Sequence, residues 1–234
     1  MNSDVDVLEN PVAQSLLGHH AHLARRLGQA VTYLPDVATF CAVPAEPDAV
    51  DWSELARLLG PGGFADMFSS PALPPPDWEP VFELEGRLML WPGKDRLGEP
   101  LPGADVSIVE LGPNNVPEML DLVTRAEPGP FWPRTCELGT YLGIRARGRL
   151  VAMAGERLRP PGWTEISAVC TAPEARGQGH AGRLVRALVE RILSRGEQPF
   201  LYVAEANSGA IALYERLGFE SRKPVTFRGF RTPG

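Results

Sequence analysis

Residues 176–181 read RGQGHA and separate a predicted strand, residues 165–171, from a predicted helix, residues 183–193. A glycine-rich turn from a strand into a helix leaves several backbone N–H groups unpaired and pointing the same way. Such a turn can hold an anion, typically a phosphate or pyrophosphate, and its glycines lack the Cβ atoms that would keep the anion at a distance. Turns of this kind are common, so the surrounding residues decide what this one binds.

Composition is that of an ordinary globular protein of one large or two small domains. The chain has 234 residues, of which 44% are hydrophobic and 22% charged. No apolar run approaches the roughly 18 residues of a membrane-spanning helix, and the acidic start of the chain lacks the basic region of a signal peptide. We therefore expect a cytoplasmic protein with no membrane contact. The widely spaced Cys41, Cys136 and Cys170 indicate free thiols, with no CxxC pair that suggests a metal.

Charge is unevenly distributed along the chain. The formal net charge of −6 argues against a general nucleic-acid binder. Residues 1–170 contain 13 Lys and Arg against 23 Asp and Glu, whereas residues 171–234 contain 10 against 6. The glycine turn thus lies in the cationic part of an acidic chain, where a polyanionic ligand would be attracted.

Two parts of the chain are predicted, residues 1–103 and residues 104–234. Residues 92–103 hold three prolines and three glycines and are interpreted as the linker. Within the first part, helical spacing of apolar residues predicts a helix over residues 11–27. Two apolar runs around a Glu-Gly pair in residues 81–91 suggest a hairpin. The first part is expected to be a smaller α/β domain.

The second part is more regular and predicts a mixed α/β domain. Its order is strand, helix, three strands, helix, strand, helix, strand. That order indicates a largely antiparallel first half and a parallel pair of strands around the long helix. The predicted ranges are, in order, 106–111, 116–126, 141–145, 150–158, 165–171, 183–193, 200–203, 208–217 and 219–230.

Three blocks of the second part share the signature of one family, in the order of the chain. The blocks are the strand over 165–171, then Arg176, Gly179 and Ala181 in the turn, then Asn207, Ala210, Leu213, Tyr214 and Leu217-Gly218-Phe219. On these blocks, residues 106–230 resemble the GNAT acyl-CoA N-acyltransferases, in particular the FR47-like branch. The first hundred residues carry no such motif, although their α/β order would also suit a degenerate half of the same fold.

The resemblance implies acetyl-CoA as the cofactor and a pose for it. The pantetheine arm would pair like a strand with the main chain of Val169 and Thr171, on either side of Cys170. Asn207 would donate a hydrogen bond to the arm from the opposite side, and Tyr214 would lie near the thioester. The pyrophosphate would rest on the amides of Gly177, Gln178, Gly179, His180, Ala181 and Gly182, anchored by Arg176 and the positive end of the following helix.

The implied reaction is attack of an amine on a thioester. The resemblance assigns the main-chain N–H of Val169 as donor to the developing oxyanion. Tyr214 would be the acid for the leaving thiolate, unless it is merely packed in the helix stripe. Glu165 would be the base, with Glu156 on the preceding strand as a rival. Either carboxylate could instead be solvated on an outer strand face, and many members of the family use ordered water as the base.

Other residues are open to two interpretations. Phe131 and Trp132 lie in the loop where this family admits the acceptor, and they either line that pocket or anchor the loop in the core. His180 departs from the small or aliphatic residue usual within the turn, and its side chain either approaches a phosphate or, as we expect, faces solvent. The cluster His19, His20 and His22 has no supporting acid or cysteine, so we interpret it as surface residues and predict no metal site.

The expected function is transfer of an acetyl or short acyl group from acetyl-CoA to a primary amine in a ternary complex. The acceptor would be a small molecule or a peptide, and the protein a monomer or homodimer. The alternative is a non-catalytic acyl-CoA-binding regulatory module, which would need neither Glu165 nor Tyr214. A Rossmann domain is disfavoured because the strands predicted before the turn look antiparallel.

Overall fold

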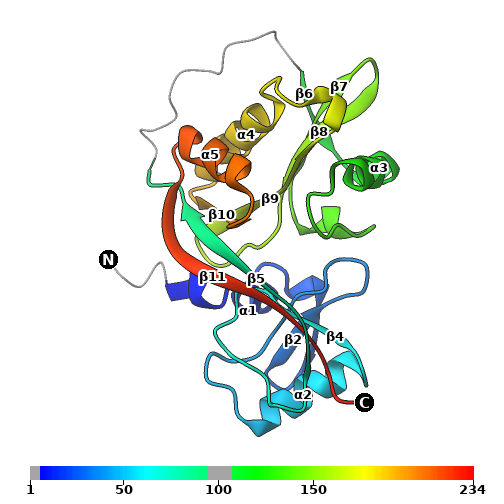
Figure 1. The fold of residues 1–234 in the computed structure, drawn as a ribbon, viewed down its shortest axis with the longest axis vertical. Helices are drawn as coiled ribbons and strands as arrows, with labels where there is room; N and C mark the ends of the chain where they lie inside the picture. The colour runs from blue at the N-terminus through cyan, green and yellow to red at the C-terminus, as the bar shows by residue number, and fades with distance from the viewer. Residues whose placement is uncertain (1–5, 94–106) are drawn as a thin grey trace.

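The computed structural model describes residues 6–93 and 107–234, in which an eight-stranded sheet dominates (Figure 1). The strand order is β4-β11-β5-β10-β9-β8-β7-β6. Neighbouring strands of this sheet are antiparallel except β9 and β10, which are parallel, as the sequence predicts. The strands are β4 Phe64–Met67, β5 Glu79–Leu90, β6 Ile108–Leu111, β7 Tyr141–Ala146, β8 Arg149–Glu156, β9 Trp163–Thr171, β10 Gln198–Ala204 and β11 Glu220–Arg231.

Helices cover both faces of this sheet around its centre. Helix α3, Val116–Ala126, lies on one face, and α4, His180–Ser194, lies on the other beside α5, Ser208–Leu217 (Figure 1). Because both faces are covered, β8 is buried along nearly its whole length. The mixed, mostly antiparallel α/β fold expected for the second part is therefore confirmed.

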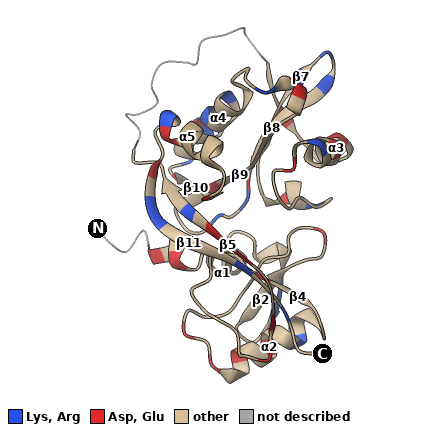
Figure 2. Ribbon diagram, viewed as in Figure 1, with Lys and Arg blue, Asp and Glu red and all other residues tan. Residues whose placement is uncertain are grey.

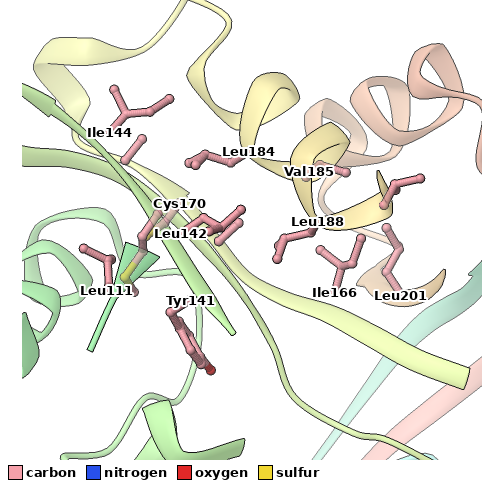
Figure 3. Close-up of a cluster of buried hydrophobic side chains, with 14 of the residues drawn as sticks. Leu111, Tyr141, Leu142, Ile144, Ile166, Cys170, Leu184, Val185, Leu188 and Leu201 are labelled. Carbon is pink, nitrogen blue, oxygen red and sulfur yellow. The ribbon is translucent and has the colours of Figure 1, made fainter. Parts of the chain in front are cut away.

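Helix α4 shows why the sequence forms this core. Leu184, Val185 and Leu188 share one face at helical spacing and point toward Leu142 and Ile166 of the strands (Figure 3). Each of these three helix residues is 0% exposed. Burying a side chain of this size is worth about 1.5–3 kcal/mol, so this single face contributes several kcal/mol to folding.

A long two-stranded ribbon joins the two parts of the chain. β5 pairs along its length with β11, and its upper half also pairs with β10 (Figure 1). The predicted hairpin over 81–91 is wrong, because β5 is one continuous strand of 12 residues. Gly86 does not make a turn: a Cβ there would lie 2.4 Å from the ring of Phe227. This glycine allows an aromatic ring to approach the strand.

The first part contains a small antiparallel sheet packed between two helices. The sheet consists of β1 Ala24–Leu27, β2 Ala30–Tyr33 and β3 Cys41–Ala42, and the second helix is α2, Ala49–Leu59. The predicted helix over 11–27 is wrong beyond its first turns, since α1 spans only Pro11–Leu17. The chain leaves the helix there because residues 24–27 pair with β2.

The two parts share both sheet and core. β4 and β5 precede residue 104 yet belong to the eight-stranded sheet. Phe40 and Leu88 lie in one apolar cluster with Trp163 and Phe200 of the second part. Most of the predicted linker 92–103 lies outside the described residues, as do the boundary at 103/104 and Val106. The division into 1–103 and 104–234 therefore stays a prediction.

None of the described helices has the length and apolar character of a membrane span. The longest of them, α4, has 15 residues and is amphipathic rather than uniformly apolar.

Candidate active site

The strand β9 is distorted where the sequence predicts cofactor binding. Met153 on β8 faces Cys170, but Gly155 faces Ser167, so two residues of β9 oppose Ala154 alone. This is a β-bulge, and Ala168 within it has a positive φ of 51°. On its other side β9 pairs with β10 only as far as Glu165 opposite Phe200. Beyond that point the two strands separate, and the main chain of residues 167–171 has no partner on β10 within the described residues.

A cavity of about 480 Å³ lies at this separation. The residues that line it come from the bulged end of β9, the end of β10, the start of α5 and the end of α3. Predicted cofactor and catalytic residues are among them: Val169, Cys170, Thr171, Arg176, Asn207 and Tyr214. The structure therefore brings together side chains and main chain from positions up to 45 residues apart in the sequence.

The glycine turn has the conformation that its sequence predicts. Gly177 and Gly179 have positive φ of 77° and 75°, which L-residues with a Cβ rarely adopt. Gly179 is the N-cap of α4, so the amides of the first turn have no intrahelical partner. The side chain of Arg183 donates to the carbonyl of Gln178 over 2.8 Å and holds the turn. Figure 2 shows Lys and Arg on α4, α5 and β11, which belong to the cationic part of the chain.

His180 differs from the expectation that it faces solvent. Its side chain is buried, with 7% of the residue exposed, and its Nδ1 has no hydrogen-bond partner. Burial and the nearby Arg183 lower the pKa of this imidazole, so it is neutral at neutral pH. Its main-chain amide still belongs to the turn.

Tyr214 and Asn207 are both placed by helix α5. Asn207 caps the helix through its Oδ1, which accepts from the amide of Ala210 over 3.1 Å, leaving its side-chain NH₂ for another partner. Tyr214 is buried, packs edge-on against Phe219 and lines the cavity. Burial, with a smaller contribution from Glu165, raises the pKa of Tyr214 to about 12. The phenol therefore keeps its proton throughout the neutral pH range.

The two predicted carboxylates are buried rather than solvated. Glu165 is 0% exposed and accepts two hydrogen bonds from Arg157 and one from the amide of Leu158. Glu156 is paired with Arg195 over 2.9 Å. Neither lines the cavity. Among the described residues that line it, Glu127 is the only acidic one, and it ends α3 with a positive φ of 49°.

The aromatic residues of the acceptor loop lie away from the cavity. Phe131 is buried and packs edge-on against Tyr141 in the core, whereas Trp132 is 39% exposed. Neither lines the cavity. For Phe131 this favours the anchoring interpretation over the pocket-lining one.

The histidine cluster is only partly at the surface. His19 and His22 are exposed, but His20 is buried between the hydroxyl of Tyr33, at 2.9 Å, and the carbonyl of Leu138, at 3.0 Å. Burial lowers the pKa of His20 to about 4, so it is a neutral core residue. Among the described residues, no group of three His, Cys, Asp or Glu is arranged to hold a metal ion.

The sequence did not predict the residues at the end of the cavity away from the glycine turn. This end is lined by Arg157, Ser167 and Tyr202. The guanidinium of Arg157 lies over the rings of Phe40 and Phe68, from the first part of the chain. Arg157 directly follows β8, and no local pattern in the sequence could have indicated it, because its pairing with Glu165 forms only when the chain folds.

The comparisons agree with this geometry. The family described as "FR47-like protein" matches residues 141–227, which contain the bulge, the turn and α5. A GNAT-family structure from Novosphingobium aromaticivorans is 36% identical, with a TM-score of 0.83, over 97% of this chain and 99% of that one. The chain belongs to the GNAT family of acetyltransferases.

Other members of the GNAT family are more distant or match over less. A GCN5-related N-acetyltransferase from Kribbella flavida shares the fold, with 19% identity and a TM-score of 0.64 over 97% of this chain and 96% of that one. An N-alpha-acetyltransferase RimI of Mycobacterium tuberculosis is 36% identical over 97 residues, 40% of this chain and 60% of the relative. A mycothiol acetyltransferase of Thermobispora bispora is 46% identical over 56 residues, 24% of this chain and 19% of the relative. These alignments with curated GNAT relatives thus span at most 60% of the relatives' length.

Proposed function

We propose that this chain transfers an acetyl or short acyl group from acetyl-CoA to a primary amine, by direct attack within a ternary complex. The observation that carries the proposal is the cavity where β9 and β10 separate, lined by Val169, Arg176, Asn207 and Tyr214. The names of the curated relatives, which are acetyltransferases, support it.

The residues present fit acetyl-CoA. The amides of Gly177 to Gly182 and the start of α4 suit a pyrophosphate, because they offer N–H donors and the positive end of a helix. The main chain of Val169 to Thr171 pairs with no described residue of β10, and this side of the strand suits the amide groups of a pantetheine arm. The free side-chain NH₂ of Asn207 faces the same cavity from α5.

The reaction needs three functions around the thioester that acetyl-CoA supplies. Holding the amine in one cavity with that thioester accounts for much of the rate. The N–H of Val169, at the bulge, would donate to the carbonyl oxygen as negative charge develops. Tyr214 would give its proton to the departing sulfur, and a raised pKa keeps that proton available.

Two carboxylates are candidates for the base. Glu165 would act through water past Arg157, to which both of its oxygens are hydrogen-bonded. Glu127 is a second candidate because it is among the residues that line the cavity. Glu165→Gln and Glu127→Gln distinguish them: the variant that removes the base should lose the low-pH limb of the kcat/KM profile. If both variants keep that limb, water or the amine itself fills the role.

Release of thiol from acetyl-CoA across a panel of amines tests the proposal. Thiol release that depends on an amine supports the enzyme. Tight CoA binding with no amine-dependent release would support the non-catalytic acyl-CoA-binding module instead.

We further infer that the protein works in the cytoplasm, since Cys41, Cys136 and Cys170 are all free thiols. Its acceptor would be a small molecule or a peptide amine rather than a nucleic acid. Light scattering would decide between a monomer and a homodimer.

A further inference from the structure

Arg157 occupies the end of the cavity opposite the glycine turn. Its Nε donates to Oε2 of Glu165 over 2.9 Å, and its Nη2 donates to Oε1 over 2.5 Å. This is a side-on bidentate pair, in which one edge of the guanidinium is fully used. Glu165 itself is completely buried, so the pair is held away from competing water.

Two aromatic rings from the first part of the chain hold the same guanidinium. Its Cζ lies 4.5 Å from the centre of the Phe68 ring and 5.0 Å from that of Phe40. Phe68 is in turn stacked on Phe227 of β11, with centroids 4.7 Å apart. The Arg157 side chain is thus fixed before any ligand arrives, which lowers the entropy cost of using it for binding.

One edge of this fixed guanidinium remains available. Arginine carries five N–H donors, and Glu165 accepts two of them. Nη1 donates no hydrogen bond within the part of the chain that the structure describes, and it is not among the buried atoms without a partner. Arg157 lines the cavity, and the donors that Glu165 leaves unused are those of the Nη1–Nη2 edge, which has two parallel N–H groups. This arrangement matches the two oxygens of a second carboxylate.

We infer that the acceptor is a small amine that carries a carboxylate, as an amino acid does, and that Arg157 binds this carboxylate through its free edge. The inference rests on the proposed function, since it names the acceptor of the same cavity. In a peptide, the carboxylate of the first residue is replaced by a peptide carbonyl with a single oxygen. Such a carbonyl would accept from only one of the two N–H groups on the free edge of Arg157. Glu127 on the cavity wall suits the ammonium form of the arriving amine.

The test compares alanine, alaninamide and ethylamine as acceptors, by thiol release from acetyl-CoA at equal concentrations of unprotonated amine. We expect kcat/KM for alanine to exceed that for the other two by about tenfold or more, because a site built for charge-assisted hydrogen bonds rejects analogues that lack the partner. Equal or better use of alaninamide or ethylamine overturns the inference and leaves the proposed function standing. No thiol release with any amine, while CoA still binds, contradicts both.

Variants separate recognition from a structural role. Arg157→Lys keeps the charge but removes the fork, so the ratio of kcat/KM for alanine to alaninamide should fall toward one. Arg157→Gln combined with Glu165→Gln removes both charges and gives a second readout if the single variant folds poorly. Arg159→Lys is the matched control: Arg159 also pairs with a glutamate, Glu197 at 2.7 Å, but does not line the cavity.

Calorimetric titration with CoA checks that each variant keeps its cofactor site. The Arg159→Lys variant should keep the wild-type ratio. Arg157→Lys and the double variant could instead lower kcat/KM for alanine and for alaninamide by the same factor, so that their ratio is unchanged. In that case Arg157 only supports the fold, and the inference is overturned.

Discussion

Tyr214 shows, at the scale of a residue, how the fold prepares a side chain for its proposed chemistry. Burial in α5 keeps the phenol neutral and places it on the cavity wall. The sequence indicated this residue because its neighbours along the chain carry the family pattern. It did not indicate Arg157, because the groups that fix that guanidinium, Glu165 and the rings of Phe40 and Phe68, are brought to it only by folding.

Tyr214→Phe should lower kcat by about a hundredfold, because general acid catalysis to a leaving thiolate typically contributes this much or more. The affinity for CoA, measured by calorimetry, should change little because the ring still packs against Phe219. A variant with wild-type kcat would remove Tyr214 from the acid role.

Asp66 should destabilise the protein at neutral pH. It is buried beside Thr39, whose hydroxyl donates to it over 2.8 Å, and burial raises its pKa to about 6. The pKa of Asp66 is higher in the folded state than in the unfolded state. The contribution of its protonated carboxyl group to stability is therefore fully present below about pH 4 and is lost as the pH rises through about 6. Asp66→Asn should therefore raise the free energy of unfolding by about 2 kcal/mol at pH 7.5 and by little at pH 4.

Urea titrations of the wild-type protein and Asp66→Asn at the two pH values measure this difference. An equal effect at both pH values would show that the carboxyl group does not titrate as described.

Among the helices and strands, those with a strong local sequence pattern were predicted most accurately. Helices α3 and α5 have the predicted bounds, because an amphipathic stripe lies between clear start and stop residues. β5 was predicted as a hairpin, since its pairing with β11, more than a hundred residues away, leaves no local pattern. α1 was predicted too long because the spacing of Leu23 and Leu27 continues the helical period into a strand.

The glycine turn gives a prediction at the scale of an element. Gly177→Ala should cost about 1 kcal/mol of stability because of its positive φ of 77°, and it should also weaken CoA binding, since the amides of the turn would move. Gly148→Ala is a matched control in the hairpin between β7 and β8. Its φ is 80° and, as at Gly177, a Cβ would meet nothing within 4 Å.

Thermal unfolding and CoA titration of both variants make the comparison. Similar losses of stability, with weaker CoA binding only in Gly177→Ala, are expected. Equal CoA affinity in the two variants would mean that the turn does not hold the cofactor.

The whole molecule is one structure in which the first part completes the second. β5 supplies the strand between β10 and β11, and Phe40 and Phe68 reach the end of the cavity. The predicted division at residue 104 rests on linker composition, which does not reveal that the sheet crosses it. The fold of the second part was predictable from its motifs, whereas the role of the first hundred residues depends on contacts that only the folded chain makes.

The fragment 104–234 should therefore not fold by itself. Without β5, the antiparallel partner of β10 is missing and Phe200 loses the apolar cluster that it shares with Leu88. Circular dichroism and proteolysis of the fragment would show an unfolded or aggregated chain. A cooperatively melting, protease-resistant fragment would instead support two independent domains.

Acetylation of an amine at the cavity between β9 and β10 is the activity that we propose for this GNAT chain. It is measured most directly by mass spectrometry of the acceptor after incubation of the whole protein with acetyl-CoA and the amine panel, alongside the Tyr214→Phe variant. We expect an N-acetylated amine, formed in step with thiol release and far more slowly by the variant. CoA binding with no acetylated amine in the whole panel would rule this activity out.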